Sequence, residues 1–516
     1  MRAPLVLLAA CGISSAALAQ TPLSAIDWLS ESIKDPPEFN VPPDSTPLIA
    51  PILPDIFVKK GLDPVSPDAI GFLSPTLTGF SADLWGDMPA TDIVELLSNF
   101  PNGGVPEAKN LFRRILLAQV NPAPDDRQDG LVLMARVDWL MKIGALDAAE
   151  ALIALAPVSN AAIFQRKFEI ALLTDRTAAV CETLKNTPTI SSDLSTRVYC
   201  LARGGDWNAA AITLSLGGAI GAIDPAREEA LIRFLDPELF EDAPDPEAPE
   251  PLGVMDFVLR EAVLLPRPHG LMPLPYLYRD IGDRAPLRAK IEASERLVVA
   301  GSLPANLLFA AYREGKAAAS GGVWGRASAI QSLDNALAGG DDIEIAKTVD
   351  EAYRALSDAH LLHALAEEFA EELSELPYSP EMSASRLQVL DLMYLANISN
   401  THWSEGAVLD QNRQLAKAVV ELSPLVEDPA SSALLKSIVN GLEGDAPDNQ
   451  TAKQLLIQLE QGQQGQVILA SLRLLANGAL ADPEGVRTAL YVLGAAGQSA
   501  VARRIAVQIL LLPVGG

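Results

Sequence analysis

Aromatic residues are scarce in this chain, and so are histidine, cysteine and positive charge. Only 5% of the 516 residues are Phe, Trp or Tyr, there are 4 histidines and 3 cysteines, and 66 acidic residues outnumber 39 basic ones. A net charge of −27 disfavours the Lys/Arg patches by which proteins bind nucleic acid or anionic lipid surfaces. We therefore expect no nucleic-acid partner. The apolar residues are mainly Ala and Leu, which are strong helix formers.

The sequence also lacks the motifs of common catalytic sites. It contains no GxSxG, SxxK, P-loop or HExxH pattern, which disfavours serine hydrolases, nucleotide-binding enzymes and zinc proteases. His360, His363 and Glu367 share one helix face at a spacing compatible with metal ligands, but the acidic turns that follow favour an ordinary solvated surface. We predict no catalytic residue, no metal ligand and no cofactor, and we predict that the protein is not an enzyme.

The N-terminal segment has the pattern of an export signal. Arg2 supplies a positive end, residues 5–13 are apolar, and Ala17-Leu18-Ala19 forms a small-x-small cleavage site before Gln20. We expect residues 1–19 to be a signal peptide and the mature protein to be periplasmic. In a competing interpretation, residues 8–11 form a lipobox and Cys11 carries a lipid anchor. No later stretch approaches the roughly 20 apolar residues of a membrane-spanning helix, so we expect no transmembrane segment in the mature chain.

Export makes the two remaining cysteines interpretable. Cys181 lies early in one predicted helix and Cys200 late in the next, and a short loop between antiparallel helices brings two such positions together. An oxidising compartment then favours a disulfide. Two free buried thiols are the alternative, and redox chemistry is disfavoured because there is no CxxC motif and no nearby histidine.

Residues 139–216 contain an internal repeat. Each unit is an apolar helical run, a tight turn marked by Gly or Asp, and a second run that opens on paired alanines. The pairs Ala148-Ala149, Ala178-Ala179 and Ala209-Ala210 are 30 and 31 residues apart, and such a period is typical of stacked repeats. Sustained apolar/polar alternation is absent. We predict an all-α fold, an α-solenoid of stacked helical hairpins with an irregular Pro-rich N-terminal arm.

Composition divides the rest of the chain. Residues 20–128 are predicted to form a Pro-rich arm and a first hairpin near 90–120, with Trp85 anchoring the arm to that hairpin. A repeat array over 129–240 is followed by an acidic, Pro-rich linker or surface loop at 241–251 and by a second array over 252–516. Within the second array, 285–317 and 322–357 are each predicted to be helix–turn–helix units, the second turning at Gly339-Gly340-Asp341.

Four Xaa-Pro pairs are predicted to start helices, because an N-cap side chain before a proline satisfies a free amide and pre-sets φ. They are Asp224-Pro225, Ser379-Pro380, Asp428-Pro429 and Asp482-Pro483.

The hairpin pattern resembles tetratricopeptide and Sel1-like repeats. The matching residues are the turn glycines Gly144, Gly205 and Gly497, followed by small residues at Ala148-Ala149, Ala209-Ala210 and Ala500. The resemblance implies an α-solenoid whose concave face binds a peptide or protein, and it transfers no binding residue.

We therefore expect the protein to hold another protein or peptide of the cell envelope, as a chaperone or assembly factor does. Trp324 and Trp403 lie in Gly- or Ser-containing connections and are possible interface residues, although packing into the nearest helix pair is the alternative. A second functional hypothesis is an envelope enzyme, since some lytic transglycosylases carry a long α-superhelical body. The sequence carries no signal of oligomeric state.

Overall fold

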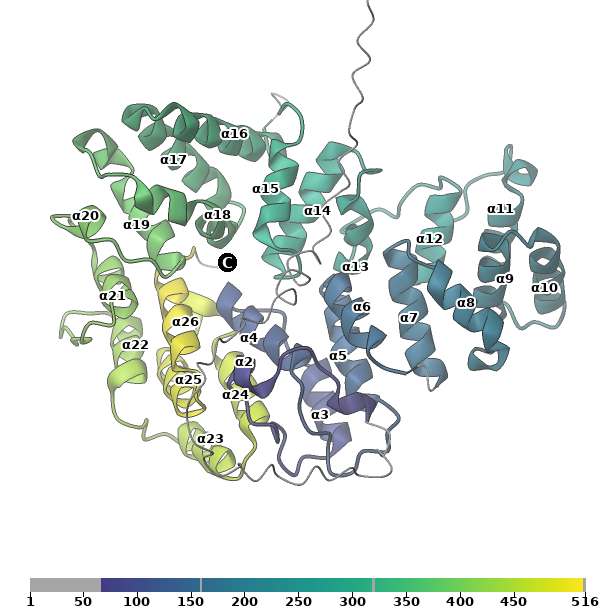
Figure 1. The fold of residues 1–516 in the computed structure, drawn as a ribbon, viewed down its shortest axis with the longest axis horizontal. Coiled ribbons are helices and arrows are strands. Elements are labelled where there is room, and N and C mark those ends of the chain that lie inside the picture. The colour runs from purple at the N-terminus through teal and green to yellow at the C-terminus, as the bar shows by residue number, and fades with distance from the viewer. Residues whose placement is uncertain (1–65, 158–159, 318–320, 514–516) are drawn as a thin grey trace, which may run out of the picture. The chain divides into compact units, whose positions relative to one another are not determined.

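The computed structural model describes residues 66–157, 160–317 and 321–513. These residues lie within one compact unit, Asp63–Gly516. Across them the chain is helical and has no strand, only an isolated bridge between Leu73 and Ala118, so the all-α prediction is confirmed (Figure 1). The predicted signal peptide, Cys11 and most of the Pro-rich arm lie outside the described residues.

The helices fall in the following order along the chain. The first part contains η1 (Pro67–Ala69), α2 (Pro75–Thr78), α3 (Ala90–Ser98), α4 (Pro106–Leu117), α5 (Leu131–Lys142), α6 (Leu146–Ala154), α7 (Ala161–Leu173), α8 (Ala178–Asn186), η2 (Pro188–Ile190), α9 (Leu194–Arg203), α10 (Trp207–Ala219), α11 (Pro225–Leu235) and η3 (Pro237–Phe240). The middle contains α12 (Val254–Ala262), α13 (Leu274–Leu277), η4 (Tyr278–Ile281), α14 (Leu287–Val299), α15 (Ala305–Arg313), α16 (Val323–Gly339), α17 (Asp342–Ser357) and α18 (Leu362–Glu375). The last part contains η5 (Pro380–Ala384), α19 (Arg386–Leu395), α20 (Thr401–Ser404), α21 (Gln411–Val420), α22 (Ala433–Glu443), α23 (Gln450–Glu460), α24 (Gln464–Leu474), η6 (Gly478–Leu480), α25 (Pro483–Ala495) and α26 (Ser499–Leu511).

Each predicted turn of residues 139–216 joins two helices in the structure. Helices α5 and α6, α7 and α8, and α9 and α10 are joined at Gly144, Asp175 and Gly205, which all have positive φ (80°, 56° and 83°). A left-handed residue ends a helix and lets a later amide bond back to a free carbonyl of its last turn. After Gly144, for example, the N–H of Ala145 donates to the Leu140 carbonyl at 2.9 Å.

The same local chemistry ends several later helices. The turn Gly340-Asp341 joins α16 to α17 and Gly497 joins α25 to α26, both as the sequence predicts. Non-glycine residues occupy the left-handed position at His360 and Asn397, and both are residue types that adopt positive φ more often than most.

Two of the four predicted Xaa-Pro helix starts are α-helix starts. Asp224 and Asp482 cap α11 and α25 with side-chain hydrogen bonds. Ser379-Pro380 opens only the 3₁₀ helix η5. The prediction at Asp428-Pro429 is wrong, because that aspartate closes a local turn by accepting from the Ala430 N–H, and Ser432 caps α22 instead.

The beginning and the end of the described chain pack together. Helix α4 contacts α24 and α26, and the N–H of Glu107 donates to the Gln508 side-chain oxygen at 2.8 Å. Trp85 is buried against Gly465 at the start of α24, so the C-terminal region takes part in anchoring it. Its neighbour Leu84 accepts a backbone hydrogen bond from Gly465 at 2.7 Å.

The acidic segment 241–251 joins η3 to α12 without regular helix. It is attached to the helices by two buried arginines: Arg233 donates to the Pro244 carbonyl, and Arg260 donates to the Pro246 carbonyl. Helix α12 then packs back on α7 and α11. The segment is therefore held by its backbone, because its carbonyls accept from the arginines.

No helix in the described part of the chain is both long enough and apolar enough to cross a membrane.

Cys181 of α8 and Cys200 of α9 lie at disulfide distance, with 2.01 Å between their sulfur atoms. This is the pair that the sequence predicts. The bridge fixes the short connection through η2 and holds the second hairpin to the third.

We expect the double variant Cys181→Ala/Cys200→Ala to lose about 3 kcal/mol of unfolding free energy, because the bridge closes a loop of about 20 residues in the unfolded chain. Urea denaturation of the oxidised protein and the variant measures the difference. Wild type treated with dithiothreitol should match the variant. Equal stability of oxidised wild type and variant would contradict the prediction.

The turn glycines provide a matched pair of substitutions. A Cβ on Gly205 meets nothing within 4 Å, whereas one on Gly144 would lie 2.6 Å from a Leu297 methyl carbon. Gly205→Ala should lower the unfolding free energy by about 1 kcal/mol, because an alanine in the left-handed conformation is strained. Gly144→Ala should cost at least about 1 kcal/mol more, because Leu297 must move. Equal losses of unfolding free energy in the two variants, measured by urea denaturation, would show that the Leu297 side chain moves aside without destabilising the protein.

Candidate functional site

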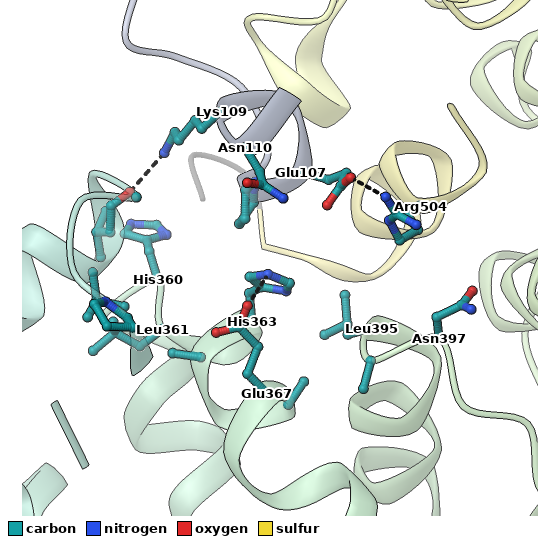
Figure 2. Close-up of a pocket in the computed structure, with 18 of the residues that line it drawn as sticks. Glu107, Lys109, Asn110, His360, Leu361, His363, Glu367, Leu395, Asn397 and Arg504 are labelled. Atoms are coloured by element: carbon teal, nitrogen blue, oxygen red, sulfur yellow. Dashed lines mark hydrogen bonds and ion pairs between the residues drawn. The ribbon is translucent and has the colours of Figure 1, made fainter. Parts of the chain in front are cut away.

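A cavity of ≈ 730 Å³ lies between helices from opposite ends of the chain. Its walls come from the start of α4, the turn between α14 and α15, the start of α18, the end of α19, and α26. The residues that line it are Pro106, Glu107, Lys109, Asn110, Arg113, Val298, Val299, Gly301, Leu303, Pro304, His360, Leu361, His363, Ala364, Ala366, Glu367, Glu371, Leu395, Ala396, Asn397, Ile398 and Arg504. Figure 2 shows Glu107, Lys109 and Asn110 of α4 on one side of this space and His363 and Glu367 of α18 on the opposite side.

The position of α4 is set by its first turn. Pro106 is the first helical residue, where its missing N–H costs nothing. The N–H of Glu107 is capped from outside the helix by Gln508, and the Glu107 carboxylate accepts from the Arg504 guanidinium at 2.6 Å. Helix α26 therefore holds the α4 end of the cavity through two polar contacts.

Two cations of α4 reach the carbonyls at the end of α14. The Lys109 ammonium donates to Val299 O at 3.0 Å, and the Arg113 guanidinium donates to Gly301 O at 2.7 Å and to the Asn110 side chain at 3.2 Å. Cations are favourable at a helix C-terminus, where carbonyls are unpaired. Burial lowers the pKa of Lys109, and it lowers the pKa of Arg113 against the opposing charges of Glu367 and Glu107.

An imidazole–carboxylate pair occupies the opposite wall. His363 Nε2 lies 3.1 Å from Glu367 Oε1, one turn along α18, and the Gln508 side-chain nitrogen lies 3.4 Å from His363 Nδ1. The hydrogen bond from His363 holds the pKa of Glu367 below its usual value, against the effect of burial. Glu367 therefore carries its negative charge into the cavity at neutral pH.

The cavity combines charges of both signs in a strongly acidic protein. Lys109, Arg113 and Arg504 balance Glu107, Glu367 and Glu371, and two histidines lie among them. An aliphatic part of the lining comes from Leu303, Leu361, Leu395 and Ile398. The lining can therefore donate hydrogen bonds, accept them and take a small apolar group.

The predicted helix face of His360, His363 and Glu367 is divided in the structure. His360 lies in the left-handed turn before α18, with φ of 58°, while His363 pairs with Glu367 on the helix. Figure 2 shows His360 on the Lys109 side of the cavity and His363 facing Glu367. In the described residues, the one group of three potential metal ligands at short range contains none of these side chains.

The two tryptophans predicted as possible interface residues lie outside the cavity. Trp403 is 0% exposed, packs edge-on against Tyr378, and donates its indole N–H to Leu376 O at 3.0 Å. This is the packing alternative, so the interface hypothesis for Trp403 is wrong: the residue presents no surface. Trp324 is half-buried at the start of α16 and packs on the core.

A different tryptophan is open to solvent. Trp207 at the start of α10 is 51% exposed, and Ile212, Leu216 and Ile220 are exposed along and just beyond the same helix. No charge occurs between Asp206 and Asp224. The sequence signal was present in this uncharged apolar stretch, which the sequence analysis interprets only as a helical run of the repeat.

The cavity cations were missed by sequence reasoning. Arg113-Arg114 and Arg503-Arg504 are basic doublets in an acidic chain, and that is their only local signal. Nothing in the sequence indicates that Arg504 meets Glu107, because 397 positions separate the partners.

Comparisons of this chain with protein-family models, with curated proteins and with solved structures find no match.

Arg113→Met keeps the aliphatic stem but removes the hydrogen bonds to Gly301 O and Asn110. We expect it to lower the unfolding free energy by about 2 kcal/mol, since hydrogen bonds from a charged donor are among the stronger ones. Arg288→Met is the control, because Arg288 is 69% exposed and its one ion pair within the described residues is with Glu292, one turn away. Its loss should be about 0.5 kcal/mol or less. Urea denaturation of both variants measures the contrast, and equal losses would show that the α4–α14 contact adds nothing.

Proposed function

We propose that this chain is an exported helical-repeat scaffold that binds a short segment of another cell-envelope protein, and that the cavity between α4 and α18 recognises this segment. The cavity itself carries the proposal. Its ≈ 730 Å³ falls within the range of about 300–1,000 Å³ that is typical of ligand sites. It also presents donors, acceptors and apolar carbon from elements on two sides.

The lining suits a peptide segment with a carboxylate beside an aliphatic side chain. Lys109 uses one ammonium hydrogen on Val299 O and has others to donate, and Arg504 adds a second cation. The aliphatic part of the lining would take the neighbouring side chain, and Glu367 and Glu371 would accept backbone N–H groups. The proposed cellular location rests on the sequence. Its N-terminal pattern favours export, and lipid anchoring through Cys11 is the alternative.

We also propose that the hairpins form an α-solenoid of the tetratricopeptide or Sel1-like kind. The left-handed turns at Gly144, Asp175 and Gly205 support this, since they recur at 31 and 30 residues and each joins two short helices. Proteins of this architecture commonly present extended binding surfaces.

The enzyme alternative has weaker support. A glycosidase general acid needs a carboxyl group whose pKa is raised. In the cavity, His363 lowers the pKa of Glu367 instead. Among the described carboxyl groups, burial raises the pKa of Asp68 and Asp391, and neither lines the cavity.

Peptide-library selection against the full-length protein tests the proposal, with affinities measured by calorimetry. Glu371 and Glu372 are adjacent exposed residues of α18, and of the two only Glu371 lines the cavity. We expect Glu371→Trp to weaken the selected peptides at least about tenfold, because the indole fills the site. Glu372→Trp should bind like wild type.

Two results would contradict the proposal. One is equal peptide affinity for Glu371→Trp and Glu372→Trp, which would show that the peptide binds outside the cavity. The other is a selection that enriches no peptide above background on protein whose circular dichroism shows folded helices.

A further inference from the structure

A buried carboxylate that does not line the cavity has one oxygen with no hydrogen-bond partner among the described residues. Asp68 in η1 is 2% exposed. Its Oδ1 accepts from the Leu133 N–H at 2.7 Å, at the start of α5, and its Oδ2 is buried without a hydrogen-bond partner in the described part of the chain. An unpaired buried carboxylate oxygen is costly, so this atom needs an electrostatic partner.

Two further carboxylates converge on the same point. Asp126 and Asp129 belong to the loop before α5, and one oxygen from each lies within 4.8 Å of the others and of an Asp68 oxygen. Oxygens that ligate one Ca²⁺ at about 2.3–2.6 Å are separated by at most about 5 Å. The three side chains therefore have the mutual spacing of a shared cation shell.

The backbone fixes this arrangement before any ion arrives. Asp126 accepts from the Gln128 N–H at 2.9 Å, and Asp129 accepts from the Leu131 N–H at 3.2 Å. Gly130, with φ of 77°, turns the chain into α5 and lies close to Pro67, since a Cβ there would be 3.3 Å from the Pro67 Cβ. The loop and η1 are thus in contact beside the three carboxylates.

Nearby positive charge offsets the negative charge of the three carboxylates only in part. The Arg136 guanidinium donates hydrogen bonds to backbone carbonyls, including those of Leu116, Ile70 and Ala118. Burial raises the pKa of Asp68 and the charge of Asp126 raises it further, while the Leu133 hydrogen bond, the nearby Val132 amide and the charge of Arg136 lower it less. The site favours added positive charge.

We propose that Asp68, Asp126 and Asp129 bind one divalent calcium ion. The donors are all carboxylate oxygens, the ligands of hard cations, and no nitrogen or sulfur is among them, which disfavours zinc and copper. Calcium fits better than magnesium because it accepts irregular shells completed by water and carbonyl oxygens. The ion would tie η1 to the start of α5. With three protein carboxylates, we expect a Kd on the order of 0.1–1 mM, as in extracellular calcium modules.

Calorimetric titration of chelator-treated, full-length protein with calcium chloride tests the site, with magnesium chloride as a second titrant. Asp126→Asn and Asp129→Asn remove one charge each but keep an oxygen for the Gln128 and Leu131 amides. We expect one calcium per chain in wild type and at least about tenfold weaker binding in both variants. Calcium should also raise the thermal midpoint of wild type and not that of the variants.

Asp125→Asn is the matched control. Asp125 is adjacent in the same loop, but its Oδ1 accepts from the Ala90 N–H at 2.8 Å, which an asparagine oxygen can replace. This variant should bind calcium like wild type.

The proposal fails if wild type shows no saturable calcium binding up to about 10 mM, well above the range of extracellular sites, or if Asp126→Asn and Asp129→Asn bind like Asp125→Asn. Tighter binding of magnesium than of calcium would overturn the calcium assignment. Stabilisation of the Asp→Asn variants in chelator, without calcium binding by wild type, would instead show three carboxylates that merely repel one another.

Discussion

The helix pairs of this protein depend on a single backbone conformation, the left-handed residue that ends one helix and starts the turn to the next. Gly144, Asp175 and Gly205 adopt it between α5 and α10, and Gly497 adopts it before the last described helix. In each case an amide beyond the turn bonds back to the preceding helix, as Gln498 N–H does to Leu493 O at 2.8 Å. Helix ends would otherwise leave buried carbonyls unpaired, so this conformation determines where each hairpin turns and which face its second helix buries.

A different kind of contact creates the cavity. Lys109, Arg113 and Glu107 on α4 reach partners on α14 and α26 that are close in space and far apart in sequence. Side chains that bridge helix ends in this way satisfy carbonyls and amides that no neighbour in sequence can reach. The same groups line the cavity, so the residues that join these helices also give the site its charge.

Local chemistry was readable from the sequence and long-range pairing was not. The turn at Gly340, the caps at Asp224 and Asp482, and the pairing of Cys181 with Cys200 follow from residues a few positions or one hairpin apart. The Asp428 prediction is wrong because Ser432, four residues on, offers a competing cap. Trp85 packs on α24, the cations of α4 donate to carbonyls at the end of α14, and Asp68 lies beside a loop nearly sixty residues later. These partners were not predicted, because burial can bring together residues from any part of the chain.

The contact of α4 with α26 also affects how the molecule folds. In an open repeat array each unit contacts only its neighbours, so segments can fold and unfold one after another. Here an early helix needs the last one to bury its surface, and Glu107 stays without Gln508 and Arg504 until the C-terminus is present. Contacts of such high sequence separation slow folding, because the loop must close before they form. The chain between these helices should therefore melt as one cooperative unit, and loss of the last helix should release the first ones with it.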